Sequence, residues 1–200
     1  MLDAALKEGV SLSVDDRGVA YLTFAHPRSN SLPGAVLADL AATVRELGQR
    51  SDVKVVVLGS AGDRAFCAGA SFDELVAISD EEAGLAFFMG FAHVINALRS
   101  IPQLVIGRVQ GKAVGGGVGV AAATDYCLAT QHAAIKLSEL AVGIGPFVVG
   151  PAVERKLGVS AMSQLSIDAS SWGAAQWACA RGLYAGVRDD GAALAEAVDA

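Results

Sequence analysis

Two short stretches of the chain join glycines to other small residues, a pattern that can present bare backbone amides to a ligand. The first is GKAVGGGVGVAAATDY (111–126), in which three consecutive glycines precede a helical run at 118–123. A glycine in a helix interior lowers the stability of the helix by roughly 1 kcal/mol relative to alanine. A run of glycines where a helix begins therefore calls for a structural or functional explanation. A helix N-terminus carries unpaired N–H groups, and such groups suit an oxygen that becomes anionic during a reaction. Close packing of a helix on a sheet is the alternative explanation.

The second stretch is AFCAGASFDEL (65–75), which follows a predicted buried strand. Two glycine loops, each after a strand, can supply two N–H donors to one oxygen. A dinucleotide site competes for the first loop, because GVGVAA (117–122) fits G-x-G-x-x-A and Glu139 lies about 20 residues on. That fingerprint places its first glycine directly after a strand, whereas seven residues separate Val109 from Gly117 here. The dinucleotide interpretation is therefore the weaker one.

The composition is that of a globular protein rather than a disordered one. Its 200 residues are 53% hydrophobic and 18% charged, with a net charge of −6, which argues against nucleic acid as a partner. Cys67, Cys127 and Cys179 show neither a disulfide framework nor metal-ligand spacing, so we expect no metal. The N-terminus lacks the features of a signal peptide, and no apolar run is long enough for a bilayer. We expect a soluble cytoplasmic protein that does not bind membranes.

Strands alternate with helices along the chain, which is typical of the α/β class. Hydrophobic periodicity predicts a hairpin over 10–24, helices over 33–50 and 79–99, buried strands over 53–60 and 103–111, and short strands over 125–130 and 133–139. Further helices are predicted over 148–157, 160–167 and 173–181, and from 191 onward. Ser31 is the candidate N-cap of the first helix.

Both glycine stretches, together with HPRSNSLP (26–33) and SELAVGIGP (138–146), resemble the motifs of the crotonase superfamily, the enoyl-CoA hydratase/isomerase family. The resemblance runs from about residue 10 to residue 187. It implies a ββα spiral with surrounding helices, acyl-CoA substrates, and a homotrimer or dimer of trimers. Coenzyme A is then part of the substrate, and no separate cofactor is implied. We expect a crotonase-like core over 1–190, with the start of a shortened C-terminal helical region at 191–200.

The resemblance also implies roles for individual residues. The backbone N–H groups of Ala70 and Gly116 would hold the thioester oxygen as it becomes an enolate, and Glu139 would transfer the proton. The positions expected to contact the substrate are Ser29, Asn30, Leu32, Cys67, Ala68, Gly69 and Gly115.

One carboxylate of the family's hydratases is missing. Hydratases carry a glutamate three residues after the middle glycine and another twenty residues later; here these positions are Gly119 and Glu139. Hydration of a C=C bond requires one group that activates water and one that delivers a proton, whereas a 1,3-proton shift requires only one base that removes a proton and returns it. The resemblance therefore favours a Δ3,Δ2-enoyl-CoA isomerase, and GIGPF (143–147) favours it too. A hydratase and a weakly active acyl-CoA-binding protein are the alternatives.

Two expectations follow from this pattern. Glu139, buried in an apolar pocket, should have a raised pKa. A glutamate introduced at position 119, about one helical turn after Gly116, should face the same pocket and slightly increase hydration. Asp73 and Glu74 read as solvated acids at a helix start, and Cys67 reads as a core residue rather than a nucleophile.

Overall fold

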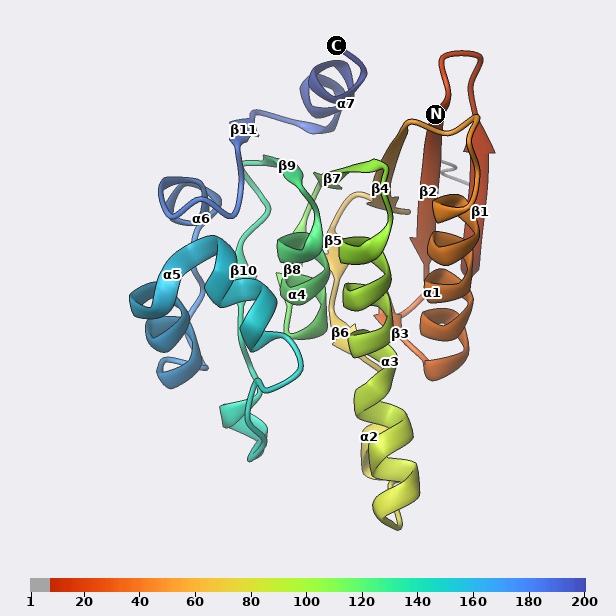
Figure 1. Ribbon diagram of the computed structural model, residues 1–200. Coiled ribbons are helices and arrows are strands. Elements are labelled where there is room, and N and C mark those ends of the chain that lie inside the picture. The colour runs from red at the N-terminus through yellow and green to blue at the C-terminus, as the bar shows by residue number, and fades with distance from the viewer. Residues whose placement is uncertain (1–7) are drawn as a thin grey trace.

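The computed structural model describes residues 8–200, and its centre is a six-stranded sheet with the order β1-β2-β4-β7-β9-β11 (Figure 1). The strands are β1 (Gly9–Val14), β2 (Val19–Ala25), β4 (Val55–Ser60), β7 (Leu104–Val109), β9 (Tyr126–Thr130) and β11 (Gly186–Arg188). The first two form an antiparallel pair, which confirms the predicted hairpin. All other neighbours in this sheet are parallel.

Helices alternate with the strands along the chain, and the last described helix follows β11. They are α1 (Gly34–Gly48), α2 (Phe72–Val76), α3 (Glu81–Ser100), α4 (Gly116–Ala123), α5 (Gly150–Ile167), α6 (Ala175–Ala180) and α7 (Gly191–Asp199). Neighbouring helices pack in the series α1, α3, α4, α5, while α7 packs on β7, β9 and β11 (Figure 1). Among residues 8–200, no helix combines the length and the apolar character needed to cross a membrane.

Five very short strands branch from the main sheet. A three-stranded sheet contains β5 (Ala65–Cys67), β8 (Lys112–Val114) and β10 (Ile135–Lys136), and a two-stranded sheet contains β3 (Ser31–Leu32) and β6 (Gly69–Ala70). Pairing of these strands brings both glycine stretches and the segment before Glu139 close together in space. Strands of two or three residues are too short to show a period of two, so the sequence predicted neither β3 nor β8.

Ser31 is not the N-cap of α1, contrary to the sequence prediction. It lies in β3, and Pro33 stands at the cap position without a side-chain cap. The carboxylate of Glu74 accepts a hydrogen bond from the Gly34 N–H at 2.9 Å instead. Because Glu74 comes from α2, forty residues further along the chain, no local pattern indicates this cap.

The two helices predicted over 148–157 and 160–167 are confirmed, because α5 is broken at Gly158, where φ is 79° and ψ is 163°. One strand boundary differs from the prediction. The strand predicted over 133–139 is reduced to Ile135–Lys136, because a 3₁₀ turn, η1 (Leu140–Val142), begins directly after Glu139. This shortening places Glu139 at a turn rather than in a strand.

Candidate active site

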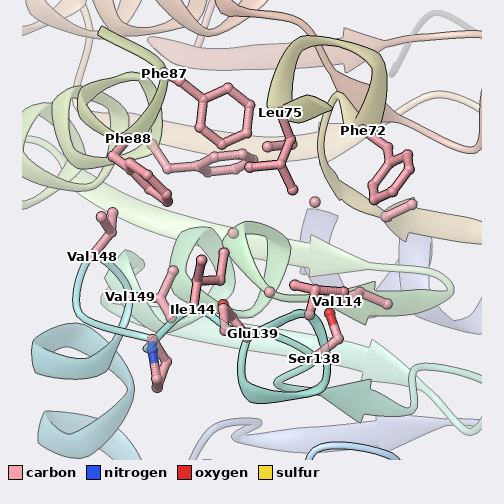
Figure 2. A pocket seen from close by; sticks show the side chains of 18 of the residues that line it. Phe72, Leu75, Phe87, Phe88, Val114, Ser138, Glu139, Ile144, Val148 and Val149 are labelled. Atoms are coloured by element: carbon pink, nitrogen blue, oxygen red, sulfur yellow. The ribbon is translucent and has the colours of Figure 1, made fainter. Parts of the chain in front are cut away.

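A cavity of about 240 Å³ lies between α2, α3, the start of α4 and the segment 138–149 (Figure 2). Large apolar side chains form most of its wall: Phe72, Leu75, Phe87, Phe88, Phe91, Val114, Val142, Ile144, Pro146, Val148 and Val149. The polar side chains in the wall are those of Ser31, Ser138 and Glu139, and the lining residues of the described chain include no Lys, Arg or His. A cavity of this kind suits an apolar ligand that carries a reactive polar end.

The glycine run places backbone, not side chains, against this cavity. Gly115 has φ 52° and ψ −116°, a conformation that side-chain-bearing residues rarely adopt, and a Cβ there would lie 3.2 Å from Oε1 of Glu139. Gly116 is the first residue of α4 and lines the cavity, so its N–H has no carbonyl partner within the helix. At Gly117 a Cβ would lie 2.6 Å from the Cys67 carbonyl oxygen, so the packing explanation holds for that glycine.

A second backbone amide comes from the loop after β5. The Ser71 N–H donates to the Leu32 carbonyl at 3.0 Å, and since successive strand N–H groups alternate in direction, the Ala70 N–H points away from β3. The two loops lie close together, because a Cβ on Gly69 would be 4.0 Å from the Gly116 nitrogen. This geometry can offer two N–H donors to one ligand oxygen.

Glu139 brings the one carboxylate among the lining residues of the described chain. Its side chain faces the cavity below the phenylalanines of α3 (Figure 2), and its Oε2 is buried without a hydrogen-bond partner among residues 8–200. Burial raises the pKa of Glu139, an effect only partly opposed by its own backbone N–H, which confirms the predicted direction. A carboxyl group with a raised pKa can both accept and return a proton near neutral pH.

The raised pKa of Glu139 predicts the acid limb of the pH–rate profile. A base must be deprotonated to act, so kcat/KM should fall as pH drops through this pKa, and the fall should begin at a higher pH than for an ordinary glutamate. The measurement is kcat/KM between about pH 4 and about pH 8. If kcat/KM stays constant down to the pH range in which an ordinary glutamate is protonated, burial does not raise the pKa of the group that must be deprotonated for activity.

The structure brings together six of the sequence-predicted site residues. Ala68, Gly69, Ala70, Gly115, Gly116 and Glu139 all line the cavity. Ser29, Asn30, Leu32 and Cys67 do not line it. Leu32 and Cys67 are fully buried in the core, and burial raises the pKa of the Cys67 thiol to about 12, as expected for a core cysteine.

Asn30 has a structural role within the fold. Its Oδ1 accepts the His26 N–H at 2.8 Å, and its Nδ2 donates to the carbonyls of Ala61 and Ala65 at 3.0 Å each. The neighbouring Ser31 lines the cavity, and its hydroxyl donates to the Ala70 carbonyl at 2.9 Å. The side chain that reaches the site from this segment is therefore Ser31, for which the sequence predicts a helix N-cap.

Sequence reasoning missed the aromatic wall on α3. Phe87, Phe88 and Phe91 all line the cavity, and their spacing of one and four residues puts them on one side of the helix. This spacing is a usable signal, although core phenylalanines show it too. The acids Asp73 and Glu74 lie in the first turn of α2 and do not line the cavity. The prediction of a solvated acid is confirmed for the exposed Asp73 and is wrong for Glu74, which is half-buried and accepts the Gly34 N–H.

The model of a protein family described as Enoyl-CoA hydratase/isomerase matches residues 15–198. The chain is 30% identical over 142 residues to YngF of Bacillus subtilis (strain 168), covering 70% of this chain and 54% of that protein. It is also 30% identical over 158 residues to ethylmalonyl-CoA decarboxylase of Gallus gallus, covering 78% and 53%. The chain thus spans about half the length of the curated relatives it matches.

Solved structures show the same fold. An enoyl-CoA hydratase of Mycobacterium smegmatis superposes with a TM-score of 0.89 at 30% identity, covering 95% of this chain and 73% of that one. An enoyl-CoA hydratase of Bacillus anthracis gives 0.88 at 26% identity, covering 96% and 74%. These matches confirm the predicted crotonase-like α/β fold. The chain belongs to the enoyl-CoA hydratase/isomerase family of the crotonase superfamily.

Proposed function

We propose that this protein is a Δ3,Δ2-enoyl-CoA isomerase, an acyl-CoA-processing enzyme that needs no cofactor beyond the coenzyme A of its substrate. The observation that carries the proposal is that Glu139 is the only ionisable side chain among the described residues that line the cavity. A 1,3-proton shift needs one base that removes a proton and returns it at another carbon, and one carboxylate can do both.

The reaction begins when the Ala70 and Gly116 N–H groups hold the thioester oxygen of a 3-enoyl-CoA. The Glu139 carboxylate removes a proton from C2, and the electron pair of that C–H bond moves into a dienolate whose oxygen the two N–H groups stabilise. The Glu139 carboxyl then returns the proton to C4, and the double bond moves from C3–C4 to C2–C3. The product is a 2-enoyl-CoA, and the carboxylate is regenerated.

Three alternative functions have less support from the lining of the cavity than isomerisation has. In hydration, one carboxylate can activate the water while a second delivers the proton, whereas the described lining residues include only one carboxylate, that of Glu139. An ethylmalonyl-CoA decarboxylase acts on a substrate with an additional carboxylate, whereas no cationic side chain in the described wall would pair with one. A purely acyl-CoA-binding role gives no reason to keep one carboxylate oxygen, Oε2 of Glu139, buried without a partner among residues 8–200, because a buried unpaired polar atom lowers stability.

The aromatic wall supports a substrate class. Phe87, Phe88 and Val148 face the space beside Glu139 (Figure 2), so an uncharged hydrocarbon acyl chain fits this wall better than a polar one. A homotrimer or dimer of trimers and a cytoplasmic location, both implied at the sequence level, stay predictions.

The proposal is tested by incubating the protein separately with 3-enoyl-CoA and 2-enoyl-CoA. We expect bond migration to exceed hydration by about 100-fold or more, since a missing general acid–base group typically costs about 10²–10⁴-fold. Product formation is followed by chromatography of the CoA thioesters. Efficient hydration without any bond migration contradicts the proposal, and no turnover of either substrate favours the binding role.

A further inference from the structure

Side chains from two other elements fill the space beside Gly119. Gly119 is buried within α4, three residues after Gly116. A Cβ built on it would lie 2.7 Å from Cγ1 of Val149 and 2.9 Å from both Cβ of Val149 and Cδ1 of Ile95. Non-bonded carbon atoms pack at about 3.5–4.0 Å. Position 119 therefore cannot carry any side chain while Val149 and Ile95 keep their places.

The two neighbours differ in how firmly they hold this space. Val149 is 2% exposed, stands at the N-cap of α5 and lines the cavity (Figure 2). Because it also contacts position 119, which does not line the cavity, Val149 lies between Gly119 and the substrate space. Its Cβ is fixed to the backbone, and its branched side chain has few rotamers. Ile95, on α3, approaches with the movable end of its side chain. Val149 is thus the residue that decides what position 119 can hold.

We propose that Val149, backed by Ile95, is a specificity-determining residue that closes the cavity wall at position 119 with apolar surface. This inference rests on the proposed isomerase function and extends it. The closed wall leaves no place for a second carboxylate or for a water molecule held by one, so a proton on Glu139 returns to the substrate. Bond migration is thereby favoured over hydration.

The same contacts overturn the expectation that a glutamate at position 119 alone increases hydration. Its Cβ would overlap Val149, and its carboxylate would be buried against apolar side chains. The single substitution Gly119→Glu is therefore expected to lower the melting temperature without any gain in hydration. A gain appears only when Val149 is shortened as well.

A thermal double-mutant cycle with Gly119→Ala and Val149→Gly tests the packing. Alanine normally stabilises a helix interior relative to glycine, but here Gly119→Ala should lower Tm by about 5 °C because its methyl group overlaps Val149. In the Val149→Gly background the same change should lower Tm much less or raise it. Gly84→Ala, on α3, is the matched control, because its Cβ would meet Ile78 at an ordinary 3.6 Å.

The outcomes of the cycle are decisive whether or not the protein is active. Strictly additive Tm losses, or a stabilising Gly119→Ala in the wild-type background, overturn the packing argument. Glycine at position 149 is required because alanine would keep the Cβ that lies 2.9 Å from the new one.

The functional arm uses the double variant Gly119→Glu with Val149→Gly. Its ratio of 2-enoyl-CoA hydration to 3-enoyl-CoA isomerisation should exceed that of wild type and of Gly119→Glu by at least about tenfold. An unchanged ratio in a folded double variant overturns the specificity role. The wild-type rates judge the proposed function separately, so the two failures are distinguishable.

Discussion

Replacing Glu139 by glutamine should lower kcat for 3-enoyl-CoA isomerisation by roughly 10²–10⁴-fold, because the amide cannot take the proton from C2. The substitution keeps the size of the side chain, so acyl-CoA binding should stay within about threefold, a difference of less than 1 kcal/mol. Steady-state kinetics give kcat, and titration calorimetry with a saturated acyl-CoA gives the affinity. Near-wild-type turnover in the variant would remove Glu139 from the mechanism.

Stability provides the control for this variant. The pKa of Glu139 is raised in the folded protein, so the ionised carboxylate lowers the free energy of unfolding, and this cost grows as pH rises from the unfolded toward the folded pKa. Glutamine removes the cost, so Tm near neutral pH should stay equal or rise. Glu154→Gln, at an exposed position of α5, should leave both kcat and Tm close to wild type.

Replacing Gly116 by proline should lower kcat by about 10²–10³-fold relative to alanine at the same position. Proline fits the first position of a helix but has no N–H, and one lost oxyanion donor costs roughly 3–4 kcal/mol. The alanine variant is needed because any Cβ at this position would lie 2.5 Å from ring carbons of Phe91. Both variants share that overlap, and they differ in the N–H.

The comparison is meaningful only for folded proteins, so circular dichroism and thermal unfolding must first show native-like behaviour for both Gly116 variants. If folded Gly116→Pro and Gly116→Ala turn over 3-enoyl-CoA equally fast, the Gly116 amide does not stabilise the enolate. The function of the glycine run would then be limited to packing, as it is for Gly117.

Long periodic segments could be predicted from the sequence. The helix at 34–48 buries Val36, Leu40, Val44 and other residues at helical spacing, and this pattern needs no information from elsewhere in the chain. The direction of the Glu139 pKa shift was also predictable, because the family resemblance placed this carboxyl in an apolar pocket. The helix could be predicted because its pattern of apolar residues is local. The pKa shift could be predicted because the family motif that contains Glu139 implies its surroundings.

The missed features depend on contacts between distant segments. Glu74 caps α1 from forty residues away, Asn30 connects β3 to the loop around 61–65, and Val149 fills the space beside Gly119. Nothing in GGGVGVAA (115–122) indicates that Gly119, the third residue after Gly116, lies against a valine thirty residues further on. The family resemblance therefore implied a missing carboxylate at position 119, and the structure places Val149 and Ile95 beside that position.

The central claim, that Glu139 alone carries a proton from C2 to C4, is tested most directly by isotope transfer in the two-substrate assay. The substrate is 3-enoyl-CoA deuterated at C2, the solvent is ordinary water, and the product is analysed by mass spectrometry and NMR. The proposed mechanism predicts deuterium at C4 of the 2-enoyl-CoA product, and loss of this transfer in Glu139→Gln. Bond migration in which the hydrogen added at C4 comes entirely from solvent, or transfer that persists in the glutamine variant, would contradict it.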